Sequence, residues 1–178
     1  SPANFEALGY EVPTTWEELD ALVEQMVTDG QVPWSMGFES SDATGWTGTD
    51  FIQDIMLVQQ GPDFVKGVID GSVPYNDPGV MQAYETYGTW ATSDTYTVGG
   101  AQGTLSTPFL EAIYKPFADP PEAMMVKQSG FAGAEIAKQF PDLQQGTHDD
   151  AGDGSGAAGR RPAAARWEWA RRRRSRWF

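Results

Sequence analysis

Apolar side chains recur three or four positions apart in the first part of the chain, which places them on one face of a helix. The members of this face are Trp16, Leu19, Leu22, Val23, Met26 and Val27. Two residue pairs next to it, Thr14 with Glu17 and Thr15 with Glu18, fit the S/T-x-x-E capping box that begins many helices. The pattern therefore predicts a helix over residues 15–28.

Five further helices follow from similar spacing and from residues that begin and end helices. Their expected ranges are about 48–60, 62–69, 78–93, 108–114 and 133–140. Thr47 or Thr49 could cap the first of these helices. Asn76-Asp77-Pro78 marks the third, because a capping side chain is followed there by proline at the first helical position. Gly99-Gly100 predicts a loop.

Two short apolar runs predict strands. Trp34–Phe38 follows Pro33, whose missing N–H does least harm at the mouth of a strand, and Ala123–Val126 suits a buried strand. Helices that alternate with short strands are typical of an α/β domain. The sequence contains no internal repeat.

The distribution of charge divides the chain near residue 147. Residues 1–147 hold 21 acidic residues against 4 lysines and no arginine, a net charge of −17. Residues 148–178 hold 8 arginines against 4 acidic residues, a net charge of +4, which brings the whole chain to −13. We expect residues 1–147 to form the folded part. The Gly-, Ala- and Arg-rich residues 148–178 are expected to be a disordered tail or the product of a shifted reading frame.

Composition narrows the classes of function. The acidic body would repel the phosphates of a nucleic acid, so no nucleic-acid partner is expected. Cysteine is absent, which excludes disulfides, thiolate metal sites and cysteine nucleophiles. The single histidine, His148, lies in the tail, so neither histidine-based catalysis nor a metal or cofactor site is expected. No apolar run approaches the roughly 20 residues that span a bilayer, and no signal-peptide pattern follows Ser1.

Four stretches of the body resemble the sugar-binding subunits of bacterial ABC importers, the extracellular solute-binding proteins, and the α-glucoside type in particular. These stretches are Pro2–Leu19, Pro33–Leu57, Asn76–Gly88 and Ile113–Ile136. The resemblance implies an incomplete second lobe of a type II periplasmic-binding-protein fold, without enzymatic activity. It also implies a sugar ligand, ABC permease subunits as partners, and a periplasmic or extracellular, membrane-associated location for the parent protein, whose signal region this chain would lack.

Sugar sites combine flat aromatic faces with planar polar groups. Trp46 lies in a glycine-flanked loop between a predicted strand and a helix, where α/β folds place ligands, and the resemblance puts a stacking aromatic at or near this position. Phe131 resembles the family's second aromatic position. Packing into the lobe is the alternative for both rings, and Trp34 could belong to either group.

Two carboxylates join this candidate site. Glu39 ends the first predicted strand and Asp50 opens the next helix, so either could accept hydrogen bonds from sugar hydroxyls. The alternatives are a solvated loop residue for Glu39 and a favourable charge at the helix N-terminus for Asp50.

Two rival classes remain open from the sequence alone. A glycoside hydrolase would need two carboxylates facing each other across a cleft, and Asp119 and Glu122 are close in sequence. A nucleic-acid binder would use Arg171–Arg174 with the neighbouring tryptophans.

Overall fold

The structure, a computed structural model, describes residues 1–145. These residues fall into two compact units: residues 3–130 with Ser1 form the first, and the second begins at Phe131 and also takes in Pro2. The predicted tail 148–178, with His148 and Arg171–Arg174, lies outside the described residues. The division of the chain at residue 147 therefore stays a prediction.

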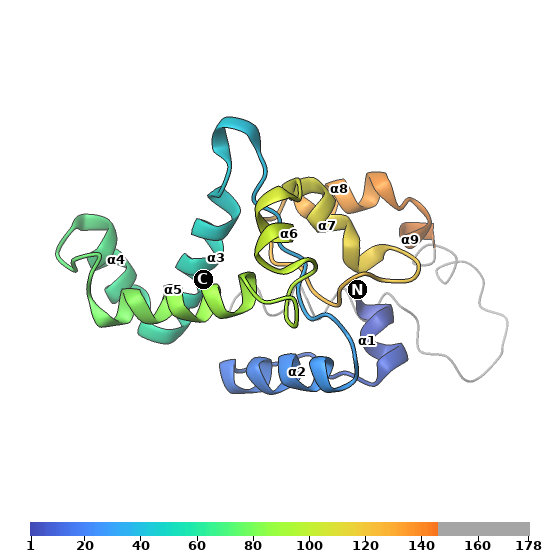
Figure 1. Ribbon diagram of the computed structural model, residues 1–178, viewed down its shortest axis with the longest axis horizontal. Helices are drawn as coiled ribbons and strands as arrows, with labels where there is room; N and C mark the ends of the chain where they lie inside the picture. The colour runs from blue at the N-terminus through green and yellow to red at the C-terminus, as the bar shows by residue number, and fades with distance from the viewer. Residues whose placement is uncertain (146–178) are drawn as a thin grey trace, which may run out of the picture. The chain divides into compact units, whose positions relative to one another are not determined.

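Helices make up most of the described chain (Figure 1). They are α1 (Pro2–Leu8), α2 (Trp16–Thr28), α3 (Trp46–Gln60), α4 (Pro62–Asp70), α5 (Pro78–Ala91), α6 (Gly100–Ser106), α7 (Phe109–Tyr114), α8 (Ala132–Gln139) and α9 (Asp142–Gln145). Two short 3₁₀ turns join them, η1 (Ser41–Ala43) and η2 (Lys115–Phe117). The six predicted helices are confirmed to within a few residues.

Helix α2 begins with a capping box, as its sequence predicts. The side-chain oxygen of Thr15 accepts the Glu18 N–H at 3.1 Å, and the Glu18 carboxylate accepts the Thr15 N–H at 3.2 Å. This reciprocal pair satisfies two backbone donors that have no partner within the helix. Of the two candidate capping boxes, the one between Thr15 and Glu18 therefore forms.

The predicted strands are shorter than expected. Among the described residues, the extended segments pair through isolated parallel bridges: Trp34 with Thr97 and with Met125, and Glu39 with Pro108. The ladder does not continue between Trp34 and Glu39, because the Phe38 N–H donates to the carbonyl of Thr104 in α6 at 2.8 Å. Helix α6 itself was not predicted, since Gly99-Gly100 read as a loop, whereas Gly99 is its N-cap and Gly100 its first residue.

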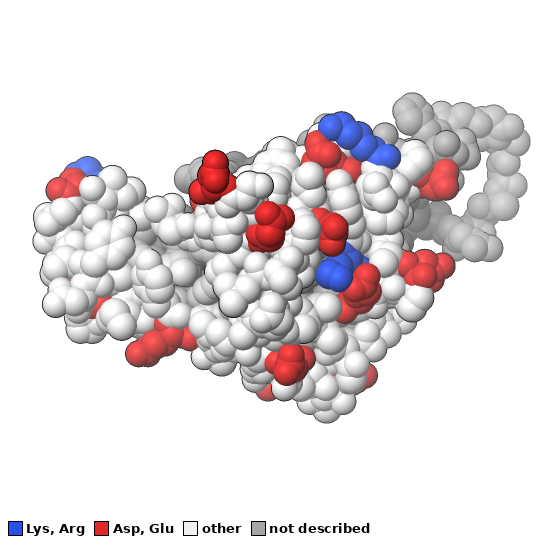
Figure 2. Space-filling model, turned by 45° about the horizontal axis from the view of Figure 1, so that its top comes forward, with Lys and Arg blue, Asp and Glu red and all other residues white. Residues whose placement is uncertain are grey.

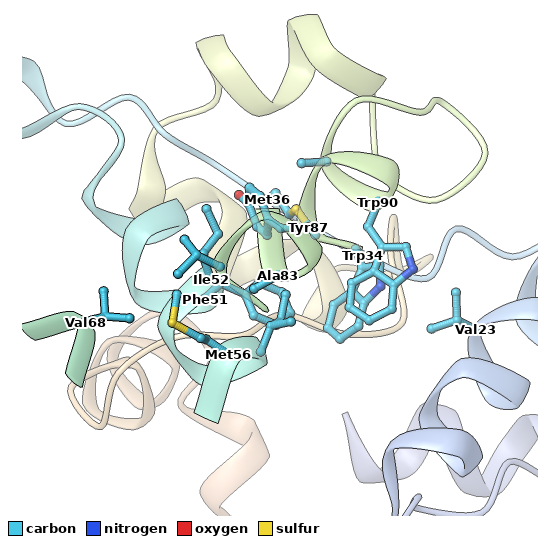
Figure 3. Packing of buried hydrophobic residues seen from close by; sticks show 13 residues of the cluster. Val23, Trp34, Met36, Phe51, Ile52, Met56, Val68, Ala83, Tyr87 and Trp90 are labelled. Carbon is cyan, nitrogen blue, oxygen red and sulfur yellow. The ribbon is translucent and has the colours of Figure 1, made fainter. Parts of the chain in front are cut away.

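The core of the first unit is built around three aromatic rings (Figure 3). The ring centroid of Trp34 lies 5.3 Å from that of Phe51 in α3 and 5.3 Å from that of Trp90 in α5. Trp16 of α2 stacks on Trp90 at 5.6 Å, so Trp90 is confirmed as a core residue and the partly buried Trp16 packs against the core. Each such ring contributes about 1.5–3 kcal/mol through burial.

None of the helices in the described part of the chain has the length and apolar character that crossing a lipid bilayer requires.

Candidate functional site

The loop from Glu39 to Gly45 leads from the core to the start of α3. Its ends are tied together, because the Gly45 N–H donates to the Phe38 carbonyl at 3.0 Å. Inside the loop, the Glu39 carboxylate accepts the Ser41 N–H at 2.9 Å. Gly45 has a φ of 97°, a left-handed conformation that glycine adopts without strain. The loop therefore presents Glu39 and the first turn of α3 on one side of the core.

Trp46 is the first residue of α3 and is half-buried. The rings of Trp46 and Phe109 meet edge to face, with centroids 5.5 Å apart and planes at 69°. Phe109 is the first residue of α7. The same two segments are joined through the backbone, since the Phe109 N–H donates to the Glu39 carbonyl at 3.0 Å. Glu39, Trp46 and Phe109 thus form one corner, which we call the α3 corner.

Asp50 lies one turn beyond Trp46 on the same side of α3. Its carboxylate accepts a hydrogen bond from the Ser129 hydroxyl at 3.3 Å. One turn further, Asp54 forms an ion pair of 2.8 Å with Lys127, whose ammonium group also lies 5.8 Å from the ring centroid of Phe51. Residues 127–129 are therefore held along α3 by two successive polar contacts.

A small pocket opens beside this corner, with a cavity volume of about 10 Å³. Its lining includes Gly37, Thr47, Phe51, Tyr87, Lys127 and Gln128. Burial raises the pKa of the Tyr87 hydroxyl above its ordinary value, so the phenol stays neutral at physiological pH. The pocket offers hydroxyl and amide groups and one paired cation, and its volume is about that of a single water molecule.

The structure corrects the interpretation of Trp34 as a ligand-stacking ring. Its side chain is 5% exposed, and Phe51 and Trp90 pack against it. A ring with so little accessible surface has no face left for a sugar. Trp34 therefore belongs to the core.

Three of the five predicted site residues, Trp46, Glu39 and Asp50, come together at the start of α3. Phe131 lies in the second unit, where it is the N-cap residue of α8 and 39% exposed. Its role as a second stacking ring stays a prediction. Sequence reasoning missed Phe109, because no spacing pattern connects residues that only the fold brings together.

Carboxylates neutralise all the lysines of the described residues. The four lysines of residues 1–145 each form an ion pair, Lys66 with Asp70, Lys115 with Glu122, Lys127 with Asp54 and Lys138 with Glu135. Figure 2 shows acidic side chains scattered over one face, with lysines in fewer places. Within the described residues, no three His, Cys, Asp or Glu side chains gather in a way that could hold a metal ion.

This arrangement, with helices packed around short parallel bridges and an aromatic and carboxylate corner at a helix start, is similar to part of solved solute-binding receptors. The bacterial solute receptor AcbH, described as preferring β-D-galactopyranose exclusively, superposes with a TM-score of 0.62 at 29% identity, over 79% of this chain and 33% of AcbH. A chitin oligosaccharide binding protein superposes with a TM-score of 0.61 at 20% identity, over 72% of this chain and 30% of its own. These structures confirm the expected fold class.

Two curated relatives confirm the resemblance to sugar-binding and osmoprotectant-binding proteins of ABC transporters. The osmoprotective compounds-binding protein GgtB of Synechocystis sp. is 39% identical over 144 residues, which cover 81% of this chain and 34% of GgtB. The alpha-glucosides-binding periplasmic protein AglE of Rhizobium meliloti is 39% identical over 141 residues, covering 79% and 30%. The chain thus spans about one third of the length of these relatives. No family model matches the chain.

Proposed function

We propose that this chain forms part of the carbohydrate-binding receptor of an ABC importer, which captures an oligosaccharide or α-glucoside without making or breaking a bond. The observation that carries the proposal is the 39% identity to GgtB over 144 residues and to AglE over 141 residues, because both are named as binding proteins. The geometry of the α3 corner supports the same conclusion.

In this proposal, the ring of Trp46 lies against the apolar C–H face of a sugar ring, and Phe109 fixes its orientation by edge contact. Glu39 and Asp50 accept hydrogen bonds from sugar hydroxyls. A neutral ligand with several hydroxyls can donate hydrogen bonds to both carboxylates while its apolar face lies on the ring of Trp46.

The receptor would work by closure of two lobes around the sugar. It would deliver the sugar to permease subunits in the membrane, from a periplasmic or extracellular location. Because this chain would supply only part of the contacts, we expect it to bind sugar weakly by itself, with a Kd in the range of about 1 mM or above.

Saturation-transfer NMR on the full chain with maltose and trehalose tests the proposal, since the method detects weak binding. We expect transfer to the sugar protons that falls strongly in Trp46→Ala. The matched control is Leu105→Ala, which removes a side chain that is 57% exposed on α6. Equal transfer in the wild type and Trp46→Ala would contradict the proposed site, and micromolar binding by this chain alone would contradict the two-lobed mechanism.

The same samples test the hydrolase alternative. Asp119 and Glu122 were its candidate carboxylates, and Glu122 forms an ion pair with Lys115. We expect no release of glucose from maltose over days of incubation. Release that survives purification and disappears in Glu122→Gln would replace the receptor proposal with a glycoside hydrolase.

A further inference from the structure

We propose a second site for neutral sugar on this chain, in a pocket formed by α3, α4, α5 and the loop before α5. This inference deepens the proposed function and rests on it. The pocket lies wholly within the first unit and is a shallow hollow with a cavity volume of about 40 Å³, so a sugar ring would lie across its mouth against the tyrosine rings. Its lining residues come from α3, α4, α5 and the loop before α5, and Figure 1 shows these three helices.

Two tyrosine rings stand at this pocket and remain open to water. Tyr75, in the loop after α4, is 68% exposed, and Tyr84, on α5, is 41% exposed. Core packing does not explain them, because the core-facing aromatic residues of the same helix, Tyr87 and Trp90, are only 6% and 5% exposed. Exposed aromatic rings gathered at a hollow are typical of a binding surface.

The chemistry of the lining indicates the class of ligand. The floor is aliphatic, with Ile52, Met56 and Val68 buried beneath it. Thr49 and Gln53 add a hydroxyl and an amide on the α3 side. The lining contains no charged side chain, so an anion or a cation would lose its hydration without gaining a partner. Phenol rings beside hydroxyl and amide groups suit the apolar face and the hydroxyls of a neutral pyranose.

The position of the pocket favours an oligosaccharide. Trp46, Thr49 and Gln53 are three and seven positions apart on α3, so they lie on one side of the helix. Seven residues correspond to a rise of about 10 Å. A ligand of several sugar units could therefore contact both the α3 corner and the pocket at Tyr75 and Tyr84, whereas a monosaccharide could occupy only one of them.

The test is an NMR titration of the full chain, with labelled tyrosine rings and tryptophan indoles, using maltotriose at concentrations up to tens of millimolar. We expect the ring signals of Tyr75 and Tyr84 to shift together, while Tyr10, which is 6% exposed, does not respond. Tyr75→Ala or Tyr84→Ala removes one ring and should weaken the affinity for maltotriose about three- to tenfold, as measured from the shift of the remaining tyrosine. Met81→Ala is the matched control, because Met81 is 47% exposed on α5 and does not line the pocket.

The same titration separates this inference from the proposed function. In Trp46→Ala, the shifts of Tyr75 and Tyr84 should persist. A response of the Trp46 indole without any response of Tyr75 and Tyr84 would overturn the second site and leave the proposed function standing. Tyrosine shifts without a Trp46 response would support the second site and contradict the α3 corner. No response at either place would overturn both, and binding of an apolar dye that maltotriose fails to displace would assign the pocket to an apolar partner instead.

Discussion

The ring of Phe38 fills the space that a β-carbon on Gly48 would need. An ideal Cβ at Gly48 would lie 2.6 Å from Cζ of Phe38, closer than real carbon atoms approach. The Phe38 ring is in turn stacked on Tyr87, with planes 2° apart and centroids separated by 6.2 Å. Because Phe38 directly precedes Glu39, this contact fixes where the loop of the candidate site leaves the core.

Gly48→Ala should therefore destabilise the chain, although alanine favours a helix over glycine by about 1 kcal/mol. Overpacking costs about 1–3 kcal/mol, so we expect a net loss in the free energy of unfolding, measured by urea denaturation. The matched control is Gly88→Ala in α5, where an added Cβ would meet nothing within 4 Å. That variant should be up to about 1 kcal/mol more stable than the wild type. Equal effects of the two substitutions would contradict the steric account.

Trp34 and Trp46 should differ sharply in their contribution to stability. Trp34→Ala removes a ring that is 5% exposed and touches Phe51 and Trp90, so we expect a loss of about 3–5 kcal/mol. Trp46→Ala removes a half-buried ring at the start of α3 and should cost only about 1 kcal/mol. Urea denaturation of both variants measures the difference. A larger loss for Trp46 than for Trp34 would show that the two rings have been assigned to the wrong roles.

Most helices could be predicted from the sequence, because their signals are local. Helix α2 has both an apolar face and a capping box, and α5 begins where the Asp77 side chain accepts the Gly79 N–H at 2.8 Å, next to Pro78. Helix α6 was missed because its sequence, GAQGTLS, has only one large apolar residue and therefore no periodic face. The length of the strands could not be predicted either, since pairing depends on which distant carbonyl reaches each N–H.

The candidate site was predicted only in part for the same reason. Trp46, Glu39 and Asp50 are close in sequence, so a strand-loop-helix pattern was enough to group them. Phe109 reaches Trp46 only through the fold, and Tyr75 and Tyr84 line one pocket only because α4 and α5 both pack against α3. Trp34 failed as a site residue because the sequence cannot show which side of an extended segment faces the core.

The capping box of α2 should make a measurable contribution to stability. Thr15→Ala removes the hydroxyl that accepts the Glu18 N–H, and we expect a loss of about 1 kcal/mol in the free energy of unfolding, whereas Thr15→Ser should restore most of it. Thr89→Ala on α5 is the control, because this exposed hydroxyl only donates to the Glu85 carbonyl within its own helix. That change should alter stability by no more than about 0.5 kcal/mol. If Thr15→Ala were equally harmless, the capping contact would not contribute in solution.

The buried phenol of Tyr87 should make the chain sensitive to alkaline pH. Burial raises its pKa in the folded state above the ordinary value of 10.0, which applies in the unfolded state. The unfolded chain therefore releases this proton at a lower pH than the folded chain does. The contribution of Tyr87 to the free energy of unfolding is complete below pH 10 and is lost as the pH rises above it. Each further pH unit should cost about 1.4 kcal/mol through this one group.

Tyr87→Phe removes this titration and should flatten the decline. Urea denaturation of both proteins at pH values between about 8 and 11.5 measures the two slopes. The hydrogen bond from Tyr96 to Glu24 and burial at Tyr10 also raise the pKa of those phenols, but they act equally in both proteins. The difference between the slopes therefore reports Tyr87 alone. Parallel slopes would show that the hydroxyl of Tyr87 reaches water in the folded chain, and the pocket beside the α3 corner would then be more open than its buried lining indicates.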